Sequence, residues 1–383
     1  MRILFVQPSL QPPGGGNGVA AWMIRALRRE HELTVLTWAN VDLDAVNRHF
    51  GTDLAPGDAR FERVHQGFAR LLDRLPTPTD LLKTSVVMRA ARKRAAAFDL
   101  AISGNNEADF GPRALQYIHY PRYQRPRPDV DVRWFHSRVV LAAYYAFADS
   151  VAGISFDRMR ANRTLVNSDW TRDLVKRLHG IDATTVHPPV RPSTRPLPWS
   201  DRTSSFLMVG RLSPEKEIEK GIAIVDAVRE QGHDVGLTIA GAEGPRDYRV
   251  KIEEMIAKRR AWARLEIDAP RKTLDGLLGS HRYGLHAMSE EHFGMAAAEM
   301  AASGCIVFMP AGGGQTEIVD RDPRLLYASV QDAARKIVTI LDSEELQTGL
   351  RSLVAKRAME FRVEAFEEKI RAVIRECAPE ETR

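Results

Sequence analysis

The chain has 383 residues, 44% of them hydrophobic and 27% charged, a composition typical of a globular protein rather than a disordered or fibrous one. Its length indicates two domains, because single cores stop growing beyond about 250–300 residues. No apolar run approaches the ~20 residues that span a bilayer, the first residues do not have the flanks of a secretory signal, and only Cys305 and Cys377 are present, so we expect a cytoplasmic protein without a disulfide framework.

Short apolar or β-branched runs alternate with longer helical patterns along the first half of the chain. They occupy residues 2–6, 33–38, 99–103, 115–119 and 164–168. The order restarts at residue 205, with runs at 205–210, 235–241, 263–267, 283–288 and 305–309, between which lie helical patterns such as 222–230, 249–259 and 295–302. This alternation is typical of parallel sheets built from βα units. It predicts an α/β protein with two Rossmann-like, doubly wound domains that face a cleft.

A proline-rich segment, "HPPVRPSTRPLPW" (187–199), separates the two sets of strands. Such a run enters neither a helix interior nor a central strand, so it indicates a linker between domains. We therefore expect an N-terminal domain at 1–188, a linker at 189–200, and a C-terminal domain at 201–360.

Positive charge is concentrated in the first half, where 28 Lys and Arg stand against 19 Asp and Glu in residues 1–200; in 201–383 the counts are 27 and 31. This favours either an anionic partner or simply a solvated, Arg-rich surface. Residues 81–98, "LLKTSVVMRAARKRAAAF", are compatible with an interfacial helix on an anionic membrane, or with a helix packed on the sheet. No aromatic and basic recognition module is visible, so we expect no nucleic-acid partner.

A glycine-rich loop, "PPGGGNGVAAW" (12–22), follows the first predicted strand. It matches a loose dinucleotide pattern, but seven residues intervene after Val6 and no acidic residue ends the second strand, which argues against hydride transfer. A glycine loop at a helix N-terminus lets backbone amides approach an anion or a sugar, so Gly15 and Gly16 are candidate binding residues. The alternative is an ordinary surface turn.

The segment "VGRLSPEKEIEKG" (209–221) follows a predicted strand and opens a helix. Gly210 allows a tight exit, Arg211 can make a two-pronged contact with phosphate oxygens, and Lys216 adds a point charge. Together they can hold a diphosphate without a metal. Basic residues at helix starts can also be merely solvated.

Two acids, Glu291 and Glu299, bracket an apolar stretch in "EEHFGMAAAEM" (290–300). Eight helical residues span ~12 Å, about the distance from a hexose through a diphosphate to a ribose. A helix that begins near Phe293 would direct its amides and dipole toward bound negative charge. The spacing suits an extended sugar nucleotide, with each carboxylate accepting hydrogen bonds from hydroxyl groups.

These motifs, with "YIHYP" (117–121), "VNSDWT" (166–171), "AGGGQTEIV" (311–319) and "EFRVEAFEEKIRAVI" (360–374), resemble the retaining glycosyltransferases of family 4, which have the GT-B fold. The segment "GLHAMSEEHFGMAAAEMAASG" (284–304) is similar to the dolichol-linked α-1,2-mannosyltransferase branch. The resemblance covers nearly the whole chain. We also expect residues 361–383 to form a C-terminal helix that packs back toward the N-terminal domain.

The resemblance implies a role for each matching residue. Glu291 contacts the donor sugar, Glu299 contacts the ribose, and Arg211 and Lys216 bind the diphosphate. The amides of Phe293, Gly294 and Met295 bind the sugar and phosphate, and His119 lies near the reacting centre. One departure is Glu217, because the family usually has glycine after the lysine.

The expected activity is transfer of a hexose, with mannose favoured, from a nucleotide sugar to an acceptor hydroxyl in glycan, glycolipid or glycoconjugate synthesis. The resemblance implies retention of configuration and no metal or cofactor. GDP-mannose is the favoured donor, with UDP- and dTDP-sugars as alternatives, and the acceptor is a carbohydrate or a lipid-linked group. Two other functions stay open: a sugar-nucleotide 2-epimerase of the same fold, and a non-catalytic sugar-nucleotide-binding protein. The expected location is the cytoplasm, with contact to the membrane's cytoplasmic face as a further hypothesis.

Overall fold

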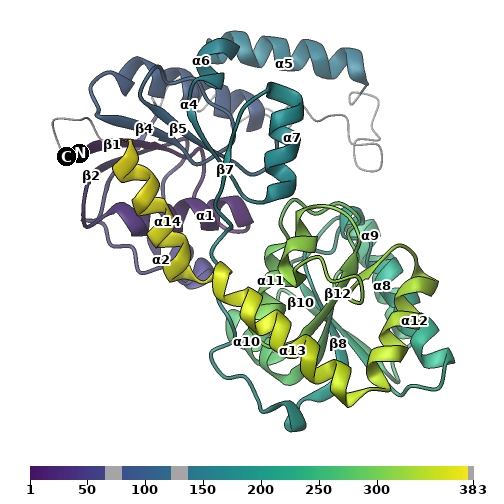
Figure 1. The fold of residues 1–383 in the computed structure, drawn as a ribbon. Coiled ribbons are helices and arrows are strands. Elements are labelled where there is room, and N and C mark those ends of the chain that lie inside the picture. The colour runs from purple at the N-terminus through teal and green to yellow at the C-terminus, as the bar shows by residue number, and fades with distance from the viewer. Residues whose placement is uncertain (65–79, 122–136, 378–383) are drawn as a thin grey trace. The chain divides into compact units, whose positions relative to one another are not determined.

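The structure, a computed structural model, describes residues 1–64, 80–121 and 137–377 (Figure 1). The chain divides into two compact units, one formed by Met1–His187 with Glu364–Arg383 and the other by Pro188–Val363. Each unit is a parallel β-sheet with helices on its faces, which confirms the predicted α/β fold class.

The N-terminal unit contains a seven-stranded parallel sheet with the order β3-β2-β1-β4-β5-β6-β7. Its strands are β1 (Arg2–Val6), β2 (Glu32–Thr37), β3 (Arg60–Arg63), β4 (Leu100–Ser103), β5 (Ala114–Ile118), β6 (Arg163–Val166) and β7 (Thr184–Thr185). Its helices are α1 (Gly15–Leu27), α2 (Leu43–Phe50), α4 (Asp80–Ala95), α5 (Arg138–Ala152), α6 (Phe156–Arg160), α7 (Asp169–His179) and α14 (Val363–Glu376). Strands β4 and β5 are buried along their whole length, as expected for central strands covered on both faces.

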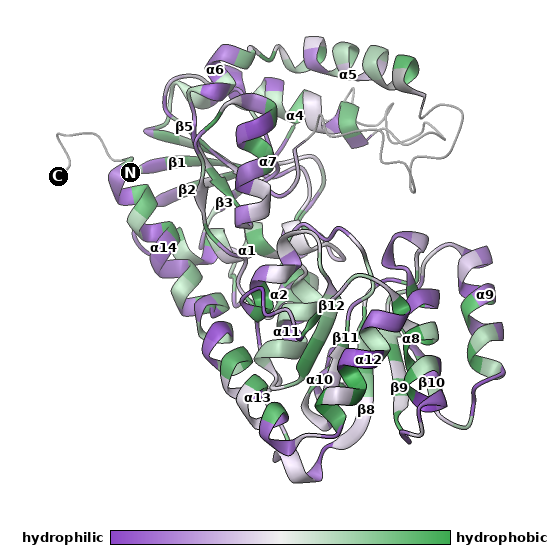
Figure 2. Cartoon of the chain, turned by 45° about the vertical axis from the view of Figure 1, so that its right-hand side comes forward, coloured by the Kyte–Doolittle hydropathy of each residue, from purple (hydrophilic) through white to green (hydrophobic). Residues whose placement is uncertain are grey.

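The C-terminal unit contains a six-stranded parallel sheet with the order β10-β9-β8-β11-β12-β13. Its strands are β8 (Thr203–Val209), β9 (Gly236–Gly241), β10 (Ala263–Ile267), β11 (His281–Leu285), β12 (Ile306–Pro310) and β13 (Leu326–Tyr327). Its helices are α8 (Ile218–Glu230), α9 (Arg246–Ala257), α10 (Arg271–Ser280), α11 (Met295–Ala302), α12 (Val330–Leu341) and α13 (Glu344–Ala358). Short 3₁₀ turns include η3 (Pro214–Lys216) and η4 (Gly314–Val319). In Figure 2 strand β12 is mostly green, whereas helix α12 alternates between purple and green, as a half-buried helix does.

Both sheets reverse their strand order at one point. In the N-terminal unit β1 lies between β2 and β4, so later strands are added to the sheet on both sides of it. In the C-terminal unit β8 lies in the same way between β9 and β11. Loops diverge at such a switch point and leave a crevice beyond the carboxyl ends of the strands, where ligands of this fold class bind. The residues after β8 and β11 therefore define the place to look for a site in the C-terminal unit.

Helix α4 covers the segment that the sequence analysis related to a membrane. Its residues Val87, Met88 and Ala91 are buried in a core cluster with β-strand residues such as Leu4 and Leu36. These apolar side chains are therefore not available to a lipid surface, which favours the alternative of a helix packed on the sheet. Large exposed apolar side chains in this unit lie instead on α5, where Val139 is 80% and Phe147 is 58% exposed. Among the described residues no helix is both long and apolar enough to cross a membrane.

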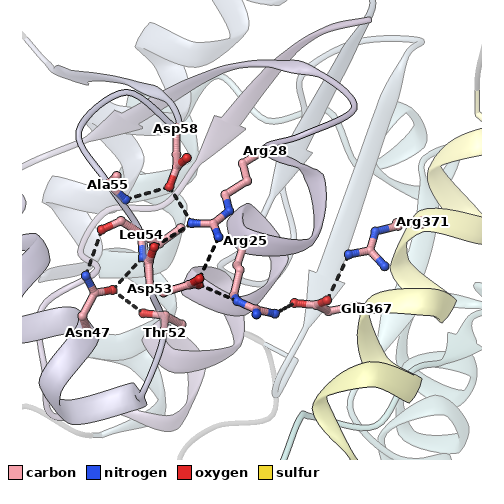
Figure 3. Close-up of polar contacts among 10 residues, drawn as sticks. All are labelled: Arg25, Arg28, Asn47, Thr52, Asp53, Leu54, Ala55, Asp58, Glu367 and Arg371. Carbon is pink, nitrogen blue, oxygen red and sulfur yellow. Dashed lines mark hydrogen bonds and ion pairs between the residues drawn. The ribbon is translucent and has the colours of Figure 1, made fainter.

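Helix α14 belongs to the N-terminal unit although it ends the chain, and buried ion pairs hold it there (Figure 3). Glu367, whose side chain is 9% exposed, accepts hydrogen bonds from Arg25 of α1 and from Arg371 at 3.0 Å. Arg25 also pairs with Asp53 at 2.6 Å, and Arg371 donates to the carbonyl oxygen of Ala26 at 2.9 Å. Arg25 thus lies between two carboxylates, one on the α2–β3 loop and one on α14.

Replacing Glu367 with Ala should lower the free energy of unfolding of the N-terminal unit by about 2 kcal/mol, because two half-buried guanidinium groups lose their shared acceptor. Thermal unfolding followed by circular dichroism measures the change. Asp53→Ala is the matched control: Asp53 pairs with the same arginine but is 60% exposed, so its loss should cost less than about 1 kcal/mol. Equal losses for the two variants would contradict the anchoring role of Glu367.

Candidate functional site

The loop that leaves β8 carries Gly210 and Arg211 and passes close to the loop that leaves β9. A Cβ atom on Gly241 would lie 1.7 Å from the carbonyl oxygen of Gly210, and one on Gly244 would lie 1.6 Å from that of Leu212. Only glycine allows this contact between two backbones. The contact fixes the path of the chain from Gly210 into the turn η3, which ends at Lys216.

The two cations of this loop each have an acidic partner within the unit. The guanidinium of Arg211 contacts Glu215 at 2.7 Å, and the ammonium of Lys216 contacts the carboxylate of Glu291 at 2.5 Å. Lys216 and Glu291 come from the loops after β8 and β11, which lie side by side at the switch point. The structure therefore brings together two residues that the sequence analysis assigned to the same ligand.

His286 adds a third polar group beside Glu291. Its Nε2 lies 3.6 Å from a Glu291 carboxylate oxygen and is buried, with no hydrogen-bond partner among the residues that the structure describes. Burial lowers the pKa of His286 to about 4, so the imidazole is neutral at physiological pH. Burial also opposes ionisation of Glu291, but the charge and hydrogen bond of Lys216, together with the other neighbouring groups, outweigh it and hold the pKa of that carboxyl below its usual value. The cluster at neutral pH is a carboxylate, an ammonium and a neutral ring.

A pocket opens beside this cluster. About 280 Å³ of empty space, part of it open solvent, lies here, and Gly210, Lys216 and His286 line it together with apolar side chains of β8, β9 and β11. Apolar walls with a few convergent polar groups are typical of small-molecule sites. Gly210 and Lys216, which the sequence analysis took from one motif, therefore border this cavity beside His286.

The loop 288–291 that presents Glu291 is held from the side of η4. The side-chain amide of Gln315 donates to the carbonyl oxygen of Met288 at 3.0 Å, and the backbone amide of Gly314 donates to that of Glu291 at 2.9 Å. Gly313 has a φ of 73°, and a Cβ there would lie 2.4 Å from the Glu291 carbonyl oxygen, so this approach also requires glycine. The "AGGGQTEIV" segment thus acts by fixing the backbone around Glu291.

Helix α11 begins at Met295, as the helical pattern at 295–302 predicted and two residues after Phe293, because Gly294 has a φ of 96° and ends the preceding turn. Glu291 consequently lies in a loop, and only Glu299 lies on the helix. The interval between the two acids is therefore helical only from Met295 onward. Phe293 is 2% exposed and packs against Phe361 in the core, so it can offer its backbone but not its side chain to a ligand. The first-turn amides of α11 have no acceptor within the helix.

Glu299 lies on the first turns of α11 and faces arginines. Its carboxylate accepts from Arg271 at 3.1 Å, and its side chain is 19% exposed. Burial raises the pKa of Glu299 above its usual value, although the charges of Arg271 and Arg191 oppose the change. Ionising this carboxylate in the folded protein therefore costs free energy, and such perturbed pKa values are common at functional sites.

In the N-terminal unit the glycine loop and His119 contact each other. Helix α1 begins at Gly15, directly after Gly14, whose φ of 152° suits glycine. A Cβ on Gly16 would lie 3.2 Å from Nε2 of His119, so the helix start packs against the imidazole ring. His119 follows β5, and the loop after β1 therefore meets the loop after β5 beyond the carboxyl ends of the strands.

The His119 ring is neutral and its orientation is fixed. Burial lowers the pKa of His119 to about 4, and its Nε2 lies 3.1 Å from the carbonyl oxygen of Gly104. Because a carbonyl oxygen only accepts, Nε2 carries the proton and Nδ1 keeps its lone pair. The backbone around it is held by Asn106, whose side-chain oxygen accepts from the His119 amide at 2.8 Å, and by Asn167.

Each unit thus gathers its own candidate residues. Lys216 and Glu291 contact each other, Gly16 contacts His119, Arg211 is 57% exposed beside Glu215, and Glu299 pairs with Arg271. The sequence analysis gave no role to His286, Gln315 or Arg271. His286 lies near the carboxyl end of the predicted strand 283–288 and directly follows the observed β11, a position that could have marked it. The contacts of Gln315 and Arg271 depend on segments that are distant in sequence.

No group of three His, Cys, Asp or Glu side chains placed to bind a metal is present in residues 1–64, 80–121 and 137–377. The "DVD" triplet at 129–131 lies outside the described residues.

The comparisons with known proteins agree with these motifs. Residues 193–357 match the family model described as glycosyl transferases group 1. The chain is 28% identical over 204 residues to the Dictyostelium discoideum GDP-Man:Man(3)GlcNAc(2)-PP-Dol alpha-1,2-mannosyltransferase, covering 47% of this chain and 40% of the relative. It is 34% identical over 149 residues to a Mycobacterium tuberculosis GDP-mannose-dependent alpha-(1-6)-phosphatidylinositol dimannoside mannosyltransferase, covering 37% of each. The matches thus span about two fifths of these relatives.

Solved structures match along almost the whole chain. The glycosyltransferase WaaG of lipopolysaccharide biosynthesis has a TM-score of 0.69 at 14% identity, covering 97% of this chain and 99% of that one. Anabaena HepE in complex with UDP-glucose has a TM-score of 0.67 at 17% identity, covering 98% and 100%. At such identities the likeness shows the fold, and that fold is GT-B, as the sequence resemblance predicted.

Proposed function

We propose that this chain, in which residues 193–357 form a domain of the glycosyl transferases group 1 family, transfers a hexose from a nucleotide sugar to an acceptor hydroxyl. The observation that carries the proposal is the contact between Lys216 and Glu291 beside the pocket at the β8 and β11 ends. In this proposal Glu291 accepts hydrogen bonds from the donor sugar. Arg211 and Lys216 bind the diphosphate, and Glu299 accepts from the ribose hydroxyls.

Bond cleavage leaves negative charge on the departing nucleoside diphosphate. A fixed cation near that charge lowers the barrier, because its attraction to the leaving group grows in the transition state and the cation is already in place. Lys216 is 26% exposed and held by Glu291, so its ammonium is largely fixed before the donor arrives. Arg211 can turn from Glu215 to the phosphates, and the amides at the start of α11 supply further positive potential.

The proposed donor is GDP-mannose. Support comes from the relatives in Dictyostelium and Mycobacterium, both described as using GDP-linked mannose, whereas the HepE structure contains UDP-glucose. UDP- and dTDP-sugars are therefore the alternatives. The proposed acceptor is a carbohydrate or lipid-linked group, as the names of the relatives suggest. A thermal-shift screen of nucleotide sugars tests the donor, because a bound donor raises stability by mass action.

We further propose that transfer retains the anomeric configuration. An inverting enzyme needs a base that deprotonates the acceptor hydroxyl from the side opposite the leaving group. Two acids that follow β4, Glu107 and Asp109, are poor candidates, because Glu107 is 1% exposed beside His179 and Asp109 pairs with Arg158 at 2.9 Å. Burial raises the pKa of Asp109, but its bonds to Arg158 and to the Ser155 amide outweigh burial and hold that pKa below its usual value.

The first-formed product from an α-linked donor should be α-linked. NMR measures the coupling of its anomeric proton within the first turnovers, before any equilibration. A β-linked product would contradict both the retaining mechanism and the resemblance on which it rests.

Transfer should also persist in excess EDTA, because Arg211, Lys216 and the α11 terminus supply the positive charge that a divalent ion supplies in other transferases. The measurement compares initial rates with EDTA, with EDTA followed by excess manganese, and without either. Loss of transfer on chelation with recovery on manganese would show that the reaction needs a metal.

The same assays distinguish the two alternative functions. A 2-epimerase would convert the sugar of the donor without any acceptor, and a non-catalytic protein would bind donor and turn over nothing. Contact with an anionic membrane stays a prediction, and sedimentation with neutral and anionic vesicles tests it.

A further inference from the structure

Glu217 is the position at which the sequence departs from the family pattern, and its backbone is unusual. It has a φ of 48° and a ψ of 44°, the left-handed conformation that glycine adopts without cost. A residue with a Cβ is strained in this conformation. The side chain therefore needs a compensating role.

The Glu217 carboxylate joins two loops of the site. One oxygen accepts from the backbone amide of Ser289 at 2.6 Å, and the other accepts from Lys220 at 2.7 Å. Lys220 also donates to the Ser289 hydroxyl at 2.9 Å, so the three residues form a closed set of contacts between the start of α8 and the loop after β11. Burial opposes ionisation, but the bonds from Lys220 and Ser289 outweigh it and hold the pKa of Glu217 below its usual value.

Ser289 lies two residues before Glu291. The opposite side of this loop is held by Gln315 and the Gly314 amide, as described above. Glu217 thus fixes the loop from a second side, through the segment that follows β8. Without it, the Ser289 amide loses its acceptor, and on this side Ser289 keeps the contact from Lys220 to its hydroxyl.

We propose that Glu217 is a positioning residue that fixes the 288–291 loop, and through it the Glu291 carboxylate, for recognition of the donor sugar. This inference rests on the proposed function, in which Glu291 contacts the sugar. It predicts a selective effect, because the nucleotide and diphosphate are bound by other residues.

The test is Glu217→Gly, which removes the carboxylate and relieves the left-handed strain. The catalytic efficiency with the intact sugar nucleotide should fall about tenfold, the cost of one charge-assisted hydrogen bond, while the affinity for the free nucleoside diphosphate changes less than about twofold. The melting temperature should stay level or rise, since glycine suits this φ. Glu217→Gln keeps an acceptor for the Ser289 amide and should recover part of the efficiency.

Asp320→Gly is the matched control. Asp320 has a φ of 54° in the same unit and is exposed, and it caps the C-terminal end of η4, five residues after Gln315. The change therefore relieves similar strain outside the 288–291 loop. It should leave donor use unchanged. Hydrogen exchange adds a readout that needs no donor: the Ser289 amide should exchange faster in Glu217→Gly and not in Asp320→Gly.

The outcomes are distinguishable. If the wild type binds no nucleotide sugar, the proposed function fails, and faster exchange at Ser289 still establishes the hold on the loop. If the wild type transfers sugar and Glu217→Gly matches it in efficiency and in Ser289 exchange, the positioning role is wrong. A lower melting temperature with equal loss of donor and nucleotide binding would show a purely structural role and would also overturn the proposal.

Discussion

Replacing Lys216 with Met should lower the catalytic efficiency of sugar transfer by about a thousandfold. The ammonium is the fixed cation nearest the proposed diphosphate site, and removing one such group from a catalytic site costs about 10²–10³ in rate. The change has a second consequence, because Lys216 is the ion-pair partner of the largely buried Glu291 at 2.5 Å. Without it, the pKa of Glu291 should rise, and the free energy of unfolding should fall by about 2 kcal/mol.

The measurements are initial rates with saturating acceptor and thermal unfolding without ligand. Lys251→Met is the matched control, because Lys251 also contacts a glutamate, Glu219, at 2.5 Å but is 58% exposed. It should change stability by less than about 1 kcal/mol and leave transfer intact. A Lys216→Met enzyme that keeps more than a tenth of wild-type efficiency would refute the assigned role.

Replacing Glu299 with Ala should weaken binding of the free nucleoside diphosphate by about 10–100-fold, the range for hydrogen bonds to a charged group. Glu291→Ala should instead impair use of the intact sugar donor and leave nucleoside diphosphate affinity within about threefold. The physical reason is position: Glu299 lies on α11 facing Arg271, whereas Glu291 lies in the loop beside Lys216 and His286. Calorimetry with nucleoside diphosphate and with intact donor separates the two, and equal effects of both variants would contradict the assignment.

The raised pKa of Glu299 also predicts that the stability of the protein depends on pH. Its pKa in the folded protein is raised, so the folded state holds the proton more tightly than the unfolded state. The stability that protonated Glu299 contributes is present below the pKa of the unfolded state, near 4.5, and is lost as pH rises through the pKa of the folded state. Glu299→Gln does not ionise, so its stability relative to the wild type should increase between pH 4 and pH 8. Urea unfolding across this range measures the difference, and a falling difference would show that Arg271 stabilises the charged form more than burial opposes it.

Much of the fold was predictable because the signals are local. The ten predicted strands are all present within a few residues, since buried parallel strands form continuous apolar runs such as "RILFV" and "IVFMP". Three strands escaped prediction. β3 reads "RFER" at an edge of the sheet, and β7 and β13 have two residues each, so none carries an apolar pattern. Their backbones pair because the neighbouring strand offers unpaired groups, which a local pattern does not encode.

The sequence by itself determined which residue types stand in the site: the Gly210, Arg211 and Lys216 motif, the two acids and the glycine loops, because these are short spacings with a chemical meaning. Tertiary structure decided how they meet. Lys216 contacts Glu291 and Glu217 contacts Ser289 because β8 and β11 are neighbours in the sheet, although Lys216 and Met288 are 72 residues apart along the chain. The contacts of Gln315 with Met288 and of Glu299 with Arg271 join other segments that are distant in sequence. Helix α11 begins at Met295 because Gly294 adopts a positive φ beside Gln315, a packing contact that no single motif contains.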